Sequence, residues 1–475
     1  MKKRCGSEKK QYSRRRIFMD KKMLLSQKKN GYELIKKTEL KNIEDYSEQY
    51  KAFLDLGRTE RECVKTAIMM AEAKGFKEYT GQAVKEGDKL YFNNRNKSIS
   101  FAVIGKEKLD KGAQIIAAHI DSPRLDLKPN PLYEDQELAY LKTHYYGGIK
   151  KWQWVTMPME LHGVVVTKDG ETVDVKIGEG DESKLVITDI LIHLGNEQAK
   201  KTMSEGVSGE HLNLLIGSIP VKGEDIKEKT KIAILEILNK KYGITEDDFV
   251  SAELEAIPAY LSTDIGLDES MIGAYGHDDR VCAFAGLKAI LDVEEPKKTS
   301  ILVLADKEEI GSVGVTGMIS QNFEYMMAEL CDKENVSLRE CFKNSFCLSC
   351  DVTAALDPGF MEVFDQRNEA RLNYGMGICK YTGARGKSGA SDASAETVAK
   401  IRAWFEKNDV IWQLSEMGKV DAGGGGTVAL DMANRNIETI DAGVPVLSMH
   451  SPFEVVAKLD CYETYKGCLA VLKEE

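Results

Sequence analysis

Long apolar runs are missing from this sequence. No stretch reaches the roughly 18 consecutive apolar residues of a membrane-spanning helix, and the basic start of the chain is not followed by the apolar segment of a secretory signal. These absences exclude a helical membrane protein. They favour a soluble, cytoplasmic chain with no membrane partner.

A surplus of positive charge is also missing. The 475 residues include 65 Lys and Arg against 76 Asp and Glu, which gives a formal net charge of −11. Because nucleic-acid phosphates are bound by clustered Lys and Arg, this balance excludes nucleic acid as the main partner. Basic residues are concentrated only in residues 1–29, which contain few apolar residues and which we predict to be a solvated tail.

Apart from one CxxC, the ten cysteines are scattered singly along the chain. Cys347 and Cys350 form a CxxC, but no second CxxC lies at zinc-site spacing. This usage is typical of reduced thiols in the cytoplasm. Since "SFCLSCDV" is a short β-prone run, we expect both thiols to be small buried hydrophobes, with redox or zinc chemistry as the alternative.

Helical and strand-like segments alternate along the chain, with one interruption. Residues 46–74 follow the helical period, and "SISFAVIG" and "AQIIAAHIDSP" are short apolar runs typical of strands. Residues 130–263 contain strand–turn–strand patterns instead, after which helices and strands alternate again up to a closing helix expected from Glu454 onward. We predict an α/β catalytic domain formed by residues 30–129 and 264–475. Its mixed, largely parallel central sheet is flanked by helices and is split by an inserted β-rich domain, residues 130–263.

Polar side chains follow apolar strands at five points: "AAHIDSP", "GHDDR", "DKEEIG", "SCDVT" and "LSMHSP". In open α/β sheets, ligands bind beyond the carboxyl ends of the strands. Singly, each residue has an ordinary explanation, such as a helix N-cap for Asp278 or Asp279 and a solvated turn for Glu308 and Glu309. Two histidines with several carboxylates, however, form a ligand set suited to zinc or a similar ion.

The adjacent Glu308 and Glu309 set a condition on the backbone. Neighbouring side chains on a regular strand point to opposite faces, so the two carboxylates serve one site only if the chain leaves strand geometry. We therefore expect the strand "ILVLAD" to end and turn at Lys307 to Glu309, just before a glycine.

The motifs "HIDSP", "HDDR", "DKEEIGS", "SCDVTAALDP" and "VPVLSMHS" resemble those of the aspartyl aminopeptidase and aminopeptidase I family of di-zinc metallo-aminopeptidases, in order and approximate spacing. "YYGG" and "DAGGGGTVA" are similar to further segments of that family. The resemblance implies a zinc exopeptidase fold and a hydrolase that releases amino acids from peptides with a free N-terminus. It also implies two divalent ions per subunit, with Zn²⁺ expected and Co²⁺ or Mn²⁺ as alternatives.

The ligands implied by the resemblance are two histidines and three carboxylates: His119, Asp278, Glu309, Asp351 and His450. His119 and Asp351 would bind one ion, Glu309 and His450 the other, and Asp278 would bridge them.

The resemblance implies two catalytic residues besides the ligands. Glu308 would be the general base for a water shared by the two ions, and Asp121 would orient the imidazole of His119.

Three further residues are candidates for substrate binding. The resemblance implies homo-oligomers, dimers and from them tetrahedral dodecamers, in which a histidine of the inserted domain enters the partner's active site; His193 is the candidate. Lys380 matches a family lysine that receives an acidic side chain, whereas Asp357 replaces a family histidine. An aspartate there would repel an acidic substrate or pair with Lys380, so we expect a preference for neutral or basic N-terminal residues.

Two other functions remain open from the sequence. One is a co-catalytic zinc deacylase or deblocking aminopeptidase with the same ligands. Activity toward N-acylated amino acids but not toward free-amine dipeptides would favour the deacylase. The other is a scaffold protein that keeps the assembly after its catalysis has decayed; the intact ligands and Glu308 argue against it.

Overall fold

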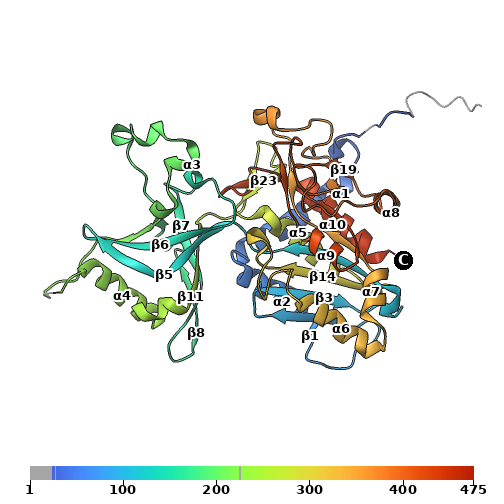
Figure 1. The fold of residues 1–475 in the computed structure, drawn as a ribbon, viewed down its shortest axis with the longest axis horizontal. Helices are drawn as coiled ribbons and strands as arrows, with labels where there is room; N and C mark the ends of the chain where they lie inside the picture. The colour runs from blue at the N-terminus through green and yellow to red at the C-terminus, as the bar shows by residue number, and fades with distance from the viewer. Residues whose placement is uncertain (1–23, 27, 224–225, 475) are drawn as a thin grey trace, which may run out of the picture.

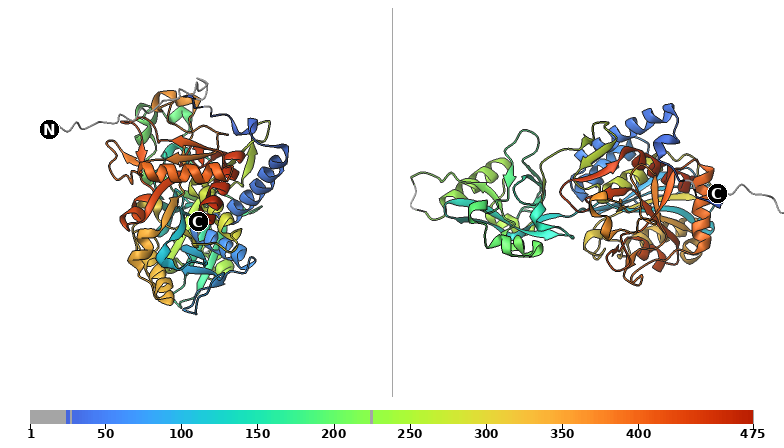
Figure 2. Two further views of the ribbon diagram at one scale, coloured as in Figure 1. Left: turned by 90° about the vertical axis from the view of Figure 1, so that its right-hand side faces the viewer. Right: turned by 90° about the horizontal axis from the view of Figure 1, so that it is seen from above.

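A computed structural model describes residues 24–26, 28–223 and 226–474. Most of the predicted tail, residues 1–29, lies outside this part of the chain. Lys28, which lies inside it, donates a hydrogen bond from Nζ to the carbonyl oxygen of Trp412 (2.7 Å). Figures 1 and 2 show two lobes, a larger one that contains both the segment that follows Lys37 and the segment that ends at Lys473, and a smaller one that projects from it. Within the described ranges, no helix is long and apolar enough to cross a membrane.

A nine-stranded mixed sheet forms the centre of the larger lobe, in the order β1-β2-β3-β14-β4-β15-β21-β17-β19. Its central strands β14, β4, β15 and β21 run parallel, while β3 and β17 pair with them in the antiparallel direction. The strands are β1 (Lys77–Glu78), β2 (Lys89–Asn94), β3 (Ser98–Val103), β4 (Ala113–His119), β14 (Thr299–Ala305), β15 (Phe346–Ser349), β17 (Met376–Cys379), β19 (Trp412–Ser415) and β21 (Glu438–Gly443).

Helices cover both faces of this sheet, because its central strands are apolar on both sides. Along β4, Ile116 and Ala118 pack into one core cluster and Ile115 and Ala117 into the other, as the two-residue period of a strand requires. The first cluster includes α1 (Lys37–Leu56), α2 (Glu60–Glu72), α5 (His277–Leu291), α8 (Ala395–Lys407) and α10 (Lys458–Lys473). The second includes α6 (Asn322–Glu334), α7 (Leu338–Asn344) and α9 (Ala429–Asn434).

Smaller sheets complete the larger lobe. A five-stranded sheet has the order β12-β13-β23-β22-β16, and β18 pairs with β20. The predicted closing helix begins at Lys458 rather than at Glu454, because the intervening residues pair with β13 as a strand. The strands are β12 (Thr263–Ile265), β13 (Met271–Ala274), β16 (Thr353–Ala354), β18 (Gly383–Ala384), β20 (Gly424–Gly425), β22 (Pro445–Leu447) and β23 (Glu454–Ala457).

The smaller lobe is built on an antiparallel seven-stranded sheet with its own apolar core. Its order is β11-β5-β6-β10-β9-β7-β8, and β11 also pairs with β7, so the sheet closes on itself. The elements are β5 (Arg124–Asp135), β6 (Leu138–Tyr146), β7 (Pro158–Val166), β8 (Thr172–Ile177), β9 (Leu185–Val186), α3 (Met203–Gly206), β10 (Leu214–Gly217), α4 (Lys229–Tyr242) and β11 (Ala252–Pro258). Strand β5 begins before residue 130, where the sequence places the domain boundary.

Candidate active site

The predicted metal ligands and the predicted base come together beyond the carboxyl ends of the parallel strands. His119 ends β4, and Glu308 and Glu309 lie in a short 3-10 turn directly after β14. Asp351 follows β15, and Asp278 lies in the first turn of α5. His450 lies in the loop between β22 and β23. Parallel strands bring these positions to one edge of the sheet although they are far apart in sequence.

Asp278 lies between the two histidines. Its Oδ1 is 3.3 Å from Nε2 of His119, and its Oδ2 is 3.1 Å from Nε2 of His450. Oδ1 of Asp351 is 3.9 Å from Nε2 of His119, and Oε2 of Glu309 is 3.6 Å from Nε2 of His450. Each histidine therefore has its own carboxylate and both share Asp278, which is the arrangement that a bridging carboxylate requires.

Glu308 lies beside this cluster with its side chain 18% exposed, and its Oε2 is 3.9 Å from Nε2 of His119. Burial, together with the negative charges of Asp121 and Asp278, raises the pKa of Glu308 to about 7. A carboxyl group that titrates near neutrality is suited to proton transfer. The expected departure from strand geometry is confirmed, because Lys307 has a left-handed backbone (φ 68°) at the start of the turn.

Asp121 supports the cluster from behind. Its Oδ1 is 3.3 Å from Nδ1 of His119. It also accepts hydrogen bonds from the backbone N–H groups of Glu308 (3.1 Å) and Glu309 (3.2 Å). One buried carboxylate thus touches a histidine and the backbone of both glutamates.

Two supports of the cluster were not found from the sequence. The carboxylate of Glu454 accepts the backbone N–H groups of His450 (2.7 Å) and Asp278 (3.1 Å). The carbonyl oxygen of Gly148 lies 2.8 Å from Nδ1 of His450. When Nδ1–H donates to that carbonyl, Nε2 keeps its lone pair on the side of Asp278 and Glu309. Little in the sequence indicated either contact. Gly148 belongs to the "YYGG" segment, to which no role was assigned, and Glu454 was expected to begin the closing helix.

The donor set and its electrostatics fit divalent cations. Two groups of three side chains, His119–Asp279–Asp351 and His119–Asp278–Glu309, each offer ligand atoms within 4.8 Å of one another. Oε1 of Glu309 is buried and has no hydrogen-bond partner among the described residues. Burial and neighbouring carboxylates raise the pKa values of Glu309 and Asp351 well above their usual range. A bound dication reverses this repulsion, so the cluster is suited to hold one.

Asp279 is an alternative to Asp278 as a ligand. It is fully buried and lies near His119 and Asp351. Its Oδ2 accepts the backbone N–H of His119 (3.3 Å), while its Oδ1 is buried without a hydrogen-bond partner among the described residues. Because Asp278 contacts both histidines, it remains the predicted bridge.

A cavity of about 140 Å³ is lined in part by Val352 and Thr353, which follow Asp351 in the chain. Its charged lining residues are of both signs: Glu416, Asp441, Arg385, Lys387 and Lys419.

Lys380 and Asp357 do not form the pair considered from the sequence. Nζ of Lys380 is 2.6 Å from Oδ1 of Asp392. The side chain of Asp357 instead accepts the backbone N–H of Gly359 (2.8 Å) and caps the 3-10 helix Pro358–Val363. The lysine is thus paired with a residue that the sequence pattern did not indicate, and the same carboxylate also pairs with Lys387 (2.8 Å).

His193 lies outside the cluster. It belongs to a 3-10 turn, Ile192–Leu194, in the smaller lobe. The flanking Ile192 and Leu194 are 82% and 68% exposed.

Comparisons with known proteins agree with the geometry. Residues 53–469 match the family model described as aminopeptidase I zinc metalloprotease (M18). The chain is 49% identical to a probable M18 family aminopeptidase 1 of Clostridium acetobutylicum, over 94% of this chain and 99% of that protein. The crystal structure of an M18 family aminopeptidase from Thermotoga maritima is 41% identical, with a TM-score of 0.91 over 95% of this chain and 100% of that one.

A more distant structure, described as the mApe1 dodecamer of S. cerevisiae, is 21% identical with a TM-score of 0.75, and covers 91% of this chain and 97% of that one. It supports the fold alone. The family match and the two closer relatives favour an aminopeptidase over the deacylase considered from the sequence. The chain therefore belongs to the aminopeptidase I zinc metalloprotease (M18) family and is a metallo-aminopeptidase.

Proposed function

We propose that this metallo-aminopeptidase works with two divalent ions, zinc by preference, held by two histidines and three carboxylates: His119, Asp278, Glu309, Asp351 and His450. The observation that carries the proposal is the position of Asp278, whose two oxygens face two different histidines at 3.3 and 3.1 Å. The buried oxygen of Glu309 without a hydrogen-bond partner among the described residues supports the same assignment.

The proposed mechanism assigns proton transfer to Glu308. When bound, the two ions would supply an activated water, polarise the scissile carbonyl and attract the free α-amine of the peptide. Glu308 takes the proton of the attacking water and delivers it to the nitrogen of the leaving amine. Asp121 keeps the ring of His119 and the backbone of Glu308 in place during both transfers.

The experiment that tests this mechanism replaces the base without touching the ligands. Glu308→Gln should lower the turnover of an aminoacyl amide by about 10²- to 10⁴-fold, because the general base is lost. Metal analysis of the same sample should still find two zinc ions per subunit. The matched control is Glu362→Gln, a substitution of an exposed glutamate that should leave the turnover and the zinc content unchanged. Unchanged turnover in Glu308→Gln would remove Glu308 as the base, and full activity after complete chelation would overturn the metal mechanism.

We further propose a preference for neutral or basic N-terminal residues. Lys380 is already paired with Asp392, so it is less available to an acidic substrate side chain. A panel of Leu, Lys, Asp and Glu amides tests this, and strong selectivity for Asp or Glu would contradict it.

The smaller lobe is proposed to be the dimerisation domain, with residues 130–263 as its bounds. Ile192 and Leu194 are exposed apolar side chains on a projecting segment, and surfaces of that kind mark protein contacts. His193 lies between them, and we propose that it enters the active site of a partner subunit. The related yeast structure is described as a dodecamer, which supports an assembly built from such dimers.

We propose the cytoplasm as the compartment. Nine cysteines are free and buried in the described part of the chain, Cys347 and Cys350 among them, which suits a reducing environment.

A further inference from the structure

The smaller lobe reaches into the predicted metal centre through Tyr146, the last residue of β6, and the two glycines that follow it. The Tyr146 hydroxyl donates a hydrogen bond to Oδ2 of Asp121 (2.8 Å). Gly147 has a positive φ of 74°, and a Cβ at this position would lie 3.1 Å from Oε2 of Glu309. The carbonyl of Gly148 is the contact of His450 described above. Three consecutive residues of one strand end therefore touch different parts of the site.

Among these contacts, the one to Asp121 affects the most groups. Besides the Tyr146 hydroxyl, Asp121 contacts Nδ1 of His119 and the backbone N–H groups of Glu308 and Glu309. A carboxylate with this many donors has little freedom to rotate. Its orientation fixes the histidine ring and the turn that carries both glutamates.

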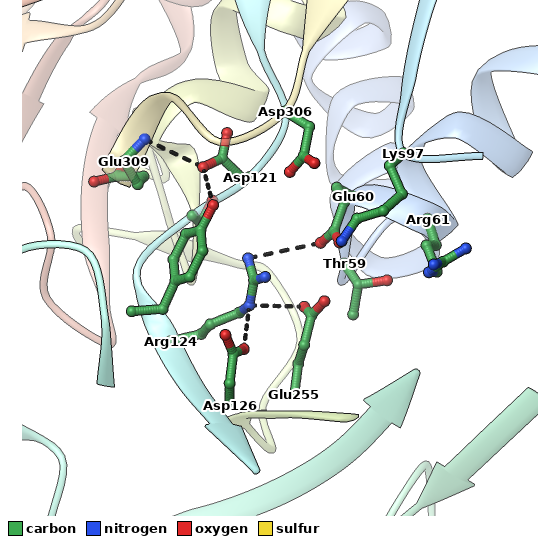
Figure 3. A network of polar contacts seen from close by, with 12 residues as sticks. Thr59, Glu60, Arg61, Lys97, Asp121, Arg124, Asp126, Glu255, Asp306 and Glu309 are labelled. Carbon is green, nitrogen blue, oxygen red and sulfur yellow. Dashed lines mark hydrogen bonds and ion pairs between the residues drawn. The ribbon is translucent and has the colours of Figure 1, made fainter. Parts of the chain in front are cut away.

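The ring of Tyr146 is held in turn by Arg124, the first residue of β5. The guanidinium group lies 3.9 Å from the ring centroid, a cation–π contact. Arg124 is itself buried among carboxylates, with Glu60 at 3.6 Å, Asp126 at 2.8 Å and Glu255 at 3.2 Å, as Figure 3 shows. Glu60 belongs to α2 of the larger lobe and Glu255 to β11 of the smaller lobe, so the guanidinium ties the two lobes together.

We propose that Tyr146 is a positioning residue for the metal centre, which acts through Asp121 and is held in place by Arg124. The inserted lobe of each subunit thereby sets the geometry of that subunit's own active site, in addition to any contact that it makes with a partner. The inference rests on the proposed metal site. Partners of this kind that orient ligands from outside typically change metal affinity or activity by about 10- to 100-fold when they are removed.

The test uses Tyr146→Phe, which removes the hydroxyl but keeps the ring on Arg124. The matched control is Tyr145→Phe, a neighbouring tyrosine that is 42% exposed. We expect zinc affinity, measured by competition with a chelating indicator, to fall about 10- to 100-fold in Tyr146→Phe and to stay unchanged in Tyr145→Phe. kcat should fall with little change in KM, while the thermal midpoints of the two variants should agree. Zinc affinity and kcat equal to the wild type would overturn the proposal.

A double-mutant cycle with Asp121→Asn tests whether Tyr146 acts through Asp121. If it does, the loss of zinc affinity in the double variant should be no larger than in Asp121→Asn alone, because the two residues share one route. Fully additive losses would overturn this route. Arg124→Lys keeps the charge but not the stacked plane, and it should weaken zinc binding in the same direction as Tyr146→Phe.

The outcomes separate this inference from the proposed function. A wild-type enzyme that binds no zinc pair would refute the metal centre itself. A wild type that binds two ions, together with a Tyr146→Phe variant of equal affinity, would refute only the role of Tyr146.

Discussion

The two lobes bury their apolar residues in different ways. In the larger lobe, parallel strands are covered on both faces, and the apolar side chains of β4 and β14 are enclosed. The smaller lobe closes an antiparallel sheet around its own core and yet exposes Ile192 and Leu194 on a projecting segment. Exposed apolar side chains also occur on the larger lobe, Val420 among them, but those of Ile192 and Leu194 flank the candidate residue His193. The proposals therefore place the chemistry in the first lobe and assembly in the second, with Tyr146 as the proposed link.

The largest effect is expected when the proposed bridging carboxylate of the larger lobe, Asp278, is removed. Asp278→Asn should lower activity to the background level and reduce the bound zinc below two ions per subunit, because the shared carboxylate is lost. Asp279→Asn, its neighbour in the same turn, should retain two ions, since Asp279 accepts a backbone N–H instead. Metal analysis of both variants is the measurement. If only Asp279→Asn lost zinc, Asp279 rather than Asp278 would be the bridging ligand.

A charge placed on the exposed apolar surface of the smaller lobe should affect the oligomeric state more than the catalytic activity. Replacing Ile192 by Asp places a charge on an apolar contact surface, and we expect the oligomer to dissociate in sedimentation velocity. The control is Lys200→Asp, a charge change at an exposed residue of the same lobe. An Ile192→Asp variant that sediments as the wild type would remove this segment from the interface.

Subunit mixing can show whether the two lobes cooperate between chains. His193→Ala and Glu308→Gln oligomers should each be nearly inactive, one lacking the donated histidine and the other the base. In a mixed dimer, the His193→Ala subunit keeps its own Glu308 and receives His193 from its partner, so activity should return. Assays of separately prepared and co-refolded samples measure this, and no recovery despite verified mixing would exclude donation in trans.

A smaller effect is expected from the ion pair between Lys380 and Asp392. Asp392→Asn should free Lys380 to attract an acidic side chain and raise the relative rate on Asp amides, by about two- to fivefold, since both partners are partly exposed. Asp357→Asn is the comparison and should change the ratio less, because Asp357 caps a 3-10 helix. Equal ratios in the wild type and Asp392→Asn would show that the pair does not affect specificity.

The smallest effect concerns the junction of the lobes, where His162 of β7 contacts Glu62 of α2 (3.1 Å) and Glu160 (3.3 Å). Burial opposes the charged imidazole, but hydrogen bonds to these glutamates outweigh it and raise the pKa of His162. Its stabilising contribution is therefore complete below the unfolded value of about 6.5 and is lost as pH rises through the raised pKa. His162→Gln should lower the thermal midpoint more at pH 6 than at pH 9. Equal losses at both pH values would contradict this sign.

The sequence predicts well the features that local pattern controls. The strand before Glu308 is a continuous apolar run, and two useful carboxylates side by side require a turn, which the backbone of Lys307 provides. The contacts of Glu454 and Tyr146 escaped prediction because they join segments far apart in the chain. The pairing of Lys380 with Asp392 also depends on the conformation of a loop, and a loop has no hydrophobic periodicity from which its conformation could be predicted.

The pairing of β11 with β7 turns the smaller lobe's sheet back on itself and leaves β8 as an outer strand. That strand carries the charged residues Asp174 and Lys176, which discourage another chain from adding to its edge. The proposed recognition of a partner by this lobe would therefore use side chains rather than the backbone. Side chains change one at a time without reopening the sheet, so the lobe's contacts are free to evolve, or to be redesigned, while the fold that supports the metal centre stays the same.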